Sequence, residues 1–191
     1  MRCEVAALFC RADSNYKAIP NVHVYDAERD ARTYDGPFPV IAHPPCRGWG
    51  ELRHMAKPRP DERNLARLSV ALVREFGGVL EHPGKSDLWR AQQLPRGADR
   101  DQFGGFSLVV DQFWWGHRAR KRTILYIVGC APADVPVVPI VLGEAPMICC
   151  GGGDRKKRNV TQKPAMPASE REHTPPDFCA WLVELARRCK A

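Results

Sequence analysis

The sequence predicts a three-layer α/β domain with a mostly parallel sheet. Short apolar runs recur along the chain, and their length and composition are typical of buried parallel strands. Two segments with apolar residues at helical spacing, 61–76 and 174–185, would supply the layers that cover the sheet. A length of 191 residues suits one domain with a core of its own, so we expect residues 1–191 to form a single domain.

The first half of the chain predicts three strands and one long helix. The strands are expected at residues 4–9, 22–26 and 39–42, and a polar loop joins the first two. The helix at 61–76 should end at Gly77 and Gly78, because glycine readily leaves the helical conformation.

The second half predicts further strands and a closing helix. Strands are expected at Val79 and Leu80, at 107–110 and at 123–128, and a short helix capped by Ser86 should follow the first of them. The apolar segment 135–142 contains a proline, which favours an edge strand or an extended connection. Residues 143–172 predict a flexible basic loop. Thr174 is then expected to cap the last helix.

The net charge of +7 favours a polyanionic partner, with nucleic acid first, although a modest positive excess also serves solubility. The eight cysteines could form a disulfide framework, but the chain shows no apolar leader segment, so we expect reduced thiols and a cytoplasmic protein. No apolar run approaches the roughly 20 residues that a membrane helix needs, which predicts no membrane partner.

One stretch, PVIAHPPCRGWG at 39–50, combines a buried strand with a candidate nucleophile. Pro44 and Pro45 end the strand and stiffen the turn, and Cys46 follows directly. Ligands of open α/β sheets bind beyond the carboxyl ends of the strands, so a thiol here is well placed to attack a substrate. The alternative is a half-buried cysteine in a tight turn.

Two other segments would bring complementary groups to the same edge of the sheet. Glu81 lies at the end of a predicted strand, and Arg118 and Arg120 precede another. A thiolate can add to carbon 6 of a pyrimidine, and a carboxyl with a raised pKa can supply a proton to ring nitrogen 3. Paired arginines would anchor the base or its phosphate.

The order PPC, E-x-P and R-x-R resembles the DNA cytosine-5 methyltransferases, and in particular the small methyltransferase-like proteins of bacteriophages and prophages. The resemblance covers most of the chain from Val22 onward. It implies a Rossmann-like methyltransferase-type fold in a bacterial or phage-infected cell, acting on DNA or a pyrimidine nucleotide. By this resemblance Cys46 is the nucleophile, Glu81 the carboxyl, and Arg118 and Arg120 the paired arginines.

The resemblance also implies S-adenosylmethionine as methyl donor, with Phe9, Asp26 and Pro44 as contacts. The first predicted loop, however, lacks the glycines that let a backbone approach this cofactor, and it is too short for a full helix and strand. We therefore expect a fold truncated at its N-terminal cofactor half. A pyrimidine-modifying enzyme that does not use S-adenosylmethionine, and an inactive nucleic-acid-binding protein, remain as alternative functions.

Several residues are expected to bind nucleic acid rather than to react with it. They are His82, Lys121, Arg122, Arg155, Lys156, Lys157 and Arg158. Trp114 and Trp115 could stack on an extruded base, but packing in the core is the favoured role. His43 and Cys46 have the spacing of metal ligands, and Cys149 and Cys150 could complete a zinc site. No C-x-x-C motif supports this, so we predict no metal.

Overall fold

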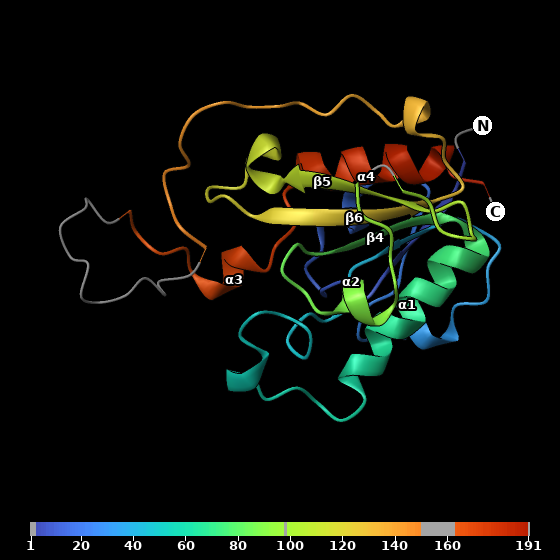
Figure 1. The fold of residues 1–191 in the computed structure, drawn as a ribbon, viewed down its shortest axis with the longest axis horizontal. Coiled ribbons are helices and arrows are strands. Elements are labelled where there is room, and N and C mark those ends of the chain that lie inside the picture. The colour runs from blue at the N-terminus through green and yellow to red at the C-terminus, as the bar shows by residue number, and fades with distance from the viewer. Residues whose placement is uncertain (1–2, 98, 150–162, 191) are drawn as a thin grey trace.

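The computed structural model describes residues 3–97, 99–149 and 163–190, and its centre is a six-stranded sheet (Figure 1). The strands lie in the order β2-β1-β3-β4-β6-β5. They are β1 (Val5–Leu8), β2 (Val22–Val24), β3 (Val40–Ala42), β4 (Gly78–Pro83), β5 (Phe106–Asp111) and β6 (Arg122–Val128). The helices are α1 (Glu62–Phe76), α2 (Leu88–Ala91), α3 (Ala168–Arg171) and α4 (Pro176–Arg188).

The sheet is mixed, which corrects the expectation of a mostly parallel sheet. Strands β1 to β4 pair in parallel, whereas β6 runs antiparallel to both of its neighbours, β4 and β5. Only residues 112–121 join β5 to β6, and a parallel pairing needs a crossover of a dozen or more residues. The architecture is α/β and compatible with the Rossmann-like class.

Helices α1 and α4 cover opposite faces of the sheet, as Figure 1 shows. Successive residues of a strand point to opposite faces, and β4 illustrates this: Val79 packs in the cluster that contains α4, and Leu80 in the cluster that contains α1. Ile41 and Tyr16 also belong to the α4 side. The same alternation determines where the next residues of β4, Glu81 and His82, are directed.

The expected helices and most expected strands are present, with differences at their ends. Gly77 and Gly78 both have positive φ angles where α1 gives way to β4, as expected of a glycine stop. Helix α4 begins at Pro176 with Pro175 as its N-terminal cap residue, rather than with a Thr174 cap. No helix in the described part of the chain is long and apolar enough to cross a membrane.

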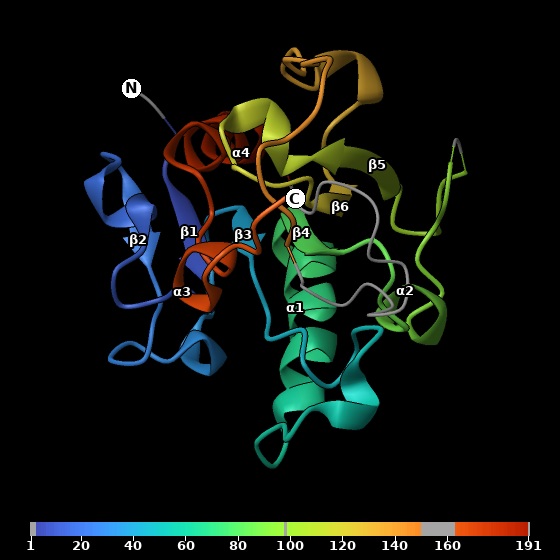
Figure 2. The same cartoon turned by 90° about the vertical axis from the view of Figure 1, so that its left-hand side faces the viewer.

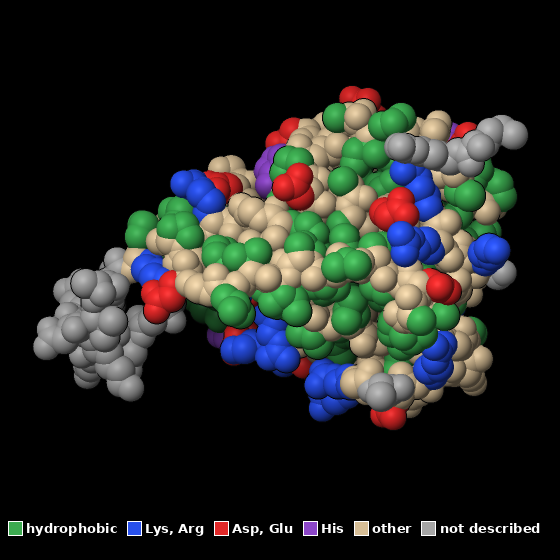
Figure 3. All heavy atoms as spheres, turned by 90° about the horizontal axis from the view of Figure 1, so that it is seen from above, with side chains coloured by type: hydrophobic (Ala, Val, Ile, Leu, Met, Phe, Trp, Pro, Cys, Tyr) green, Lys and Arg blue, Asp and Glu red, His purple; other side chains and the backbone are tan. Residues whose placement is uncertain are grey.

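The apolar segment 135–142 is an extended connection and contains no strand. It passes over the α4 layer, where the Trp181 indole nitrogen donates to the carbonyl oxygen of Val137 over 3.0 Å. Pro136 and Pro139 have no N–H to donate to a strand ladder, which explains the irregular backbone. Val137 and Leu142 are 90% and 88% exposed, and hydrophobic side chains are prominent on the face seen from above in Figure 3.

The segment that carries α3 lies against the loop that follows β1, at the carboxyl ends of the parallel strands (Figure 2). Arg11 pairs with Glu172, and Asp13 pairs with His173. Asn15 donates to the carbonyl oxygen of Thr174 over 2.8 Å. Residues 172–174 thus pack against the loop after β1 at this edge of the sheet. Of the expected loop 143–172, residues 150–162 lie outside the described part.

Candidate active site

His43 and Glu81 meet because β3 and β4 are parallel neighbours in register. Ala42 is paired with Leu80, so the residues one position further, His43 and Glu81, lie side by side on the α4 face. The imidazole Nδ1 is 3.1 Å from Glu81 Oε2. Their side chains are only 13% and 12% exposed, so water competes little for this interaction.

Two more polar side chains, both buried, hold the other oxygen of Glu81. Gln112 Nε2 donates to Oε1 over 3.1 Å, and the Thr123 hydroxyl donates to the same oxygen over 3.2 Å. Thr123 lies in β6, and Gln112 begins the short 3-10 helix that follows β5. Three chain segments distant in sequence therefore converge on one carboxyl group.

Glu81 is ionised in this environment. Burial by itself would raise its pKa, but the hydrogen bond from His43 and the positive charges of Lys121 and His43 outweigh burial and lower the pKa to about 2. From the sequence, a raised pKa was expected for this carboxyl, because the addition chemistry needs a proton from it. The structure gives the reverse, since the donors around Glu81 favour its charged form.

His43 is also held from its other side, by Tyr16. The Tyr16 hydroxyl lies 2.8 Å from His43 Nε2, and the tyrosine is 1% exposed in the core beneath α4. Burial, and then the charge of nearby Cys179, raise the pKa of Tyr16 well above its usual value, so the phenol stays neutral. Tyr16, His43 and Glu81 form a continuous chain of hydrogen bonds at the edge of the sheet.

Cys46 lies on an anchored loop with its side chain exposed. Its carbonyl oxygen accepts from the amides of Trp49 and Gly50, which closes a turn. Trp49 is fully buried and its indole donates to the carbonyl oxygen of Arg63 in α1 over 3.2 Å. The exposed thiol thus lies on a loop fixed by a buried tryptophan, which is the accessible position expected of a nucleophile.

The Cys46 thiol is within electrostatic range of both Glu81 and Lys121. Desolvation by the surrounding protein, followed by the negative charge of Glu81, raises the thiol pKa, while the Lys121 ammonium opposes that rise. The Lys121 ammonium forms no ion pair with any described residue. Lys121 therefore acts electrostatically on both the Cys46 thiol and the Glu81 carboxylate, although it was expected only among the nucleic-acid contacts.

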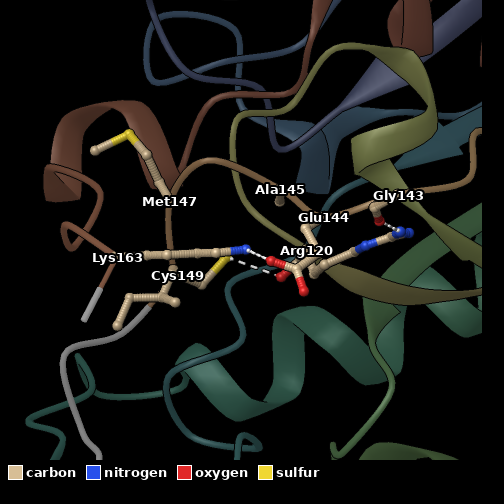
Figure 4. A pocket seen from close by; sticks show the side chains of 8 residues that line it. Arg120, Gly143, Glu144, Ala145, Met147, Cys149 and Lys163 are labelled. Atoms are coloured by element: carbon tan, nitrogen blue, oxygen red, sulfur yellow. Dashed lines mark hydrogen bonds and ion pairs between the residues drawn. The ribbon is translucent and has the colours of Figure 1, made fainter. Parts of the chain in front are cut away.

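The two arginines of the R-x-R segment are each paired with a carboxylate, so neither presents the unpaired guanidinium expected to hold a nucleotide. Arg118 pairs with Glu170 of α3, and Arg120 pairs with Asp111 and donates to the carbonyl oxygen of Gly143. Arg120 lines a cleft of about 280 Å³, where it lies along the wall toward Gly143 (Figure 4). An isolated bridge pairs Ala119 with Met147, and this contact draws the segment toward that cleft.

His82 lies in the interior, which corrects its expected contact with nucleic acid. As the neighbour of Glu81 on β4 it is directed to the opposite face, where its ring meets Trp89 edge to face at 6.3 Å. It is 0% exposed, and neither ring nitrogen has a hydrogen-bond partner among the described residues. Burial lowers its pKa to about 4, so the ring is neutral at physiological pH.

We expect His82 to make the fold acid-sensitive. Its pKa is about 4 when folded and 6.5 when exposed, so the unfolded chain binds the extra proton as the pH falls between these values. Stability should fall by about 3 kcal/mol across that window. Urea unfolding at pH 6.5 and pH 4.5 should capture about 2 kcal/mol of this loss, and His82→Phe should remove most of it. An equal loss in the variant would contradict the assignment.

The three residues expected to bind S-adenosylmethionine lie near the ends of β1, β2 and β3. They do not form an open binding site for this cofactor. Phe9 has φ near +60°, a conformation that favours glycine, and its ring packs against the α1 cluster. The Asp26 carboxylate is 7% exposed and pairs with Lys17 at 2.7 Å. Its other oxygen accepts from the amides of Glu28 and Arg29. Pro44 is buried.

Of the remaining expected contacts, some lie at the surface, some in the core and some outside the described residues. Arg122 is exposed. Trp115 packs against Phe178 and Trp181 in the core, which confirms the favoured role. The basic residues Arg155, Lys156, Lys157 and Arg158 lie outside the described residues, as does Cys150. Within the described ranges, no cluster of His, Cys, Asp and Glu side chains could hold a metal ion.

No protein-family model matches this chain, and no curated protein is significantly similar to it. Its function must therefore be inferred from the site itself. Gln112 and Thr123 were not expected in the site from the sequence, and His43 was expected only as a possible zinc ligand. The HPPC and EHP segments contained the signal for His43, since two parallel strands that end in these segments place His43 and Glu81 side by side once they are paired.

Proposed function

We propose that this protein is a DNA-modifying enzyme of the cytosine-5 methyltransferase type, with a Rossmann-like methyltransferase-type fold that is shortened in its cofactor half. In this proposal Cys46 adds to carbon 6 of a pyrimidine, Glu81 contacts ring nitrogen 3, and Lys121 replaces the expected arginines as the local cation. The net charge of +7 suits a DNA substrate.

One observation carries the proposal: an exposed thiol, a buried carboxylate and a lysine without an ion-pair partner among the described residues influence one another at the carboxyl edge of the sheet. A cysteine that served only to pack a turn would not need a buried carboxylate held by three side chains beside it. The raised pKa of the thiol means that substrate or Lys121 must help to stabilise the thiolate.

The test uses DNA that contains 5-fluorocytosine, incubated with the protein and S-adenosylmethionine. Fluorine at carbon 5 cannot leave as a proton does, so the enzyme–DNA bond should persist through denaturing electrophoresis. Peptide mapping should place the bond on Cys46. An adduct on a different cysteine, or no adduct with any pyrimidine DNA, would overturn the proposal.

A second candidate, a pyrimidine-modifying enzyme without S-adenosylmethionine, is favoured by the state of Asp26 and Phe9. The carboxylate of Asp26 is already paired with Lys17, and the turn after β1 carries a phenylalanine ring. Addition of a thiolate to carbon 6 exchanges the hydrogen at carbon 5 with solvent, and this exchange needs no methyl donor. Exchange in D₂O without a fluorocytosine adduct would select this candidate, and calorimetric binding of S-adenosylmethionine would reject it.

A further inference from the structure

The chain of hydrogen bonds from Tyr16 through His43 to Glu81 has no role in the addition chemistry derived so far. It lies inside the protein, it reaches the candidate carboxyl, and it comes from three separate elements: the 3-10 helix Asn15–Ala18, the loop after β3, and β4. The addition step requires a proton at ring nitrogen 3, and Glu81 is ionised.

We propose that His43 is the proton reservoir of the site: it shares one proton with Glu81 and delivers it through that carboxyl to ring nitrogen 3 of the pyrimidine. The inference rests on the proposed function, since it assigns the source of the proton for that same addition. His43 acts through Glu81 and is a positioning and proton-holding residue.

The partners of His43 suit both of its protonation states. Nδ1 faces the carboxylate at 3.1 Å and therefore carries a hydrogen in either state. Nε2 faces a hydroxyl at 2.8 Å, and a tyrosine hydroxyl can donate to a neutral imidazole or accept from a protonated one. The ring can thus gain or lose a proton without losing a hydrogen bond. A carbonyl oxygen in place of Tyr16 would have fixed one state.

The Cys46 thiol loses its proton to solvent, and the sulfur lone pair forms the bond to carbon 6. The carbon 5–carbon 6 π pair moves to form a carbon 4–carbon 5 π bond, and the carbon 4–nitrogen 3 π pair moves to nitrogen 3. The Glu81 carboxylate accepts the proton of protonated His43 and passes it to nitrogen 3, which leaves His43 neutral and Glu81 ionised again. On reversal, sulfur leaves carbon 6 and the proton returns to the pair.

Several groups face this pair and would affect its pH dependence. Lys121 and His82 act on Glu81, and Cys46 faces it from the loop after β3. On the side of Tyr16, Cys179 of α4 and Cys10 act on the phenol. The test therefore compares variants at several pH values and does not depend on a single apparent pKa.

The experiment follows exchange of the carbon 5 hydrogen of cytosine DNA in D₂O. In His43→Asn the side-chain amide can still donate to Glu81 but cannot release a proton to it. We expect exchange to slow by about 10²- to 10⁴-fold at neutral pH. The variant rate should rise steeply in acid, because Glu81 is protonated more readily without a cation beside it. DNA affinity, followed by fluorescence anisotropy, should not change.

His23→Asn is the matched control, because His23 pairs with Glu4 at 2.8 Å on the exposed edge strand β2, and it should exchange at the wild-type rate. If His43→Asn does not fold, Tyr16→Phe decides: it removes the acceptor for the protonated ring and should slow exchange about 10-fold with an altered pH profile. If His43→Asn or Tyr16→Phe has the wild-type rate and pH profile, the role assigned to His43 is wrong, but the proposed function still stands. A wild-type protein without exchange overturns the proposed function instead.

Discussion

Cys46→Ser is expected to abolish both the covalent adduct with 5-fluorocytosine DNA and the exchange of the carbon 5 hydrogen. A serine hydroxyl is far less acidic than a thiol and is a much weaker nucleophile at neutral pH. Because the side chain is exposed and its loop is anchored by buried Trp49, the variant should fold normally. We expect rates to fall at least about 10⁴-fold, as when a single nucleophile is removed from other enzymes.

Cys3→Ser provides the control for this loss. Cys3 is also an exposed free thiol, but it precedes β1 and so lies at the amino-terminal edge of the parallel strands, opposite Cys46. It should react at the wild-type rate. An adduct that persists in Cys46→Ser and disappears in Cys3→Ser would place the chemistry at the opposite edge and would refute the site.

The sequence was sufficient for the elements of the fold but not for their order in the sheet. Apolar runs and helical spacing are local properties, and they predict β3, β6 and α1 close to their observed bounds. The antiparallel insertion of β6 between β4 and β5 depends on pairing over long distances in the sequence. It could have been anticipated only from the short connection 112–121, which excludes a parallel pairing of β5 and β6.

Site residues could be predicted from the sequence where they lie at the ends of strands. They could not be predicted where their position depends on an ion-pair partner distant in the sequence. Cys46 and Glu81 were expected at the same edge because both lie at the carboxyl ends of strands, and β3 and β4 are parallel neighbours in register. Arg118 pairs with Glu170, a partner 52 residues away that no local motif reveals. The burial of His82 follows from strand alternation once Glu81 is assigned to the site, so that error was avoidable.

Gly78→Ala is expected to unfold the domain. Gly78 pairs with Val40 across β3 and β4, and its φ is near +118°. A Cβ atom there would lie 2.0 Å from the Val40 carbonyl oxygen and 2.6 Å from its nitrogen, so backbone must move against backbone. We expect a loss above about 4 kcal/mol, which is comparable to the whole stability of many domains. Thermal unfolding followed by circular dichroism measures it.

Gly104→Ala is the control that separates the steric clash at Gly78 from the strain of a positive φ angle. Gly104 also has a positive φ, near +70°, but nothing lies within 4 Å of the position its Cβ would take. It should cost only about 1 to 2 kcal/mol, the strain of a left-handed alanine. Strand β3 leads into His43 and Cys46, and β4 carries Glu81. Separation of these strands in Gly78→Ala should therefore also abolish exchange of the carbon 5 hydrogen. If the two variants melt alike, the close β3–β4 pairing that aligns His43 with Glu81 is wrong.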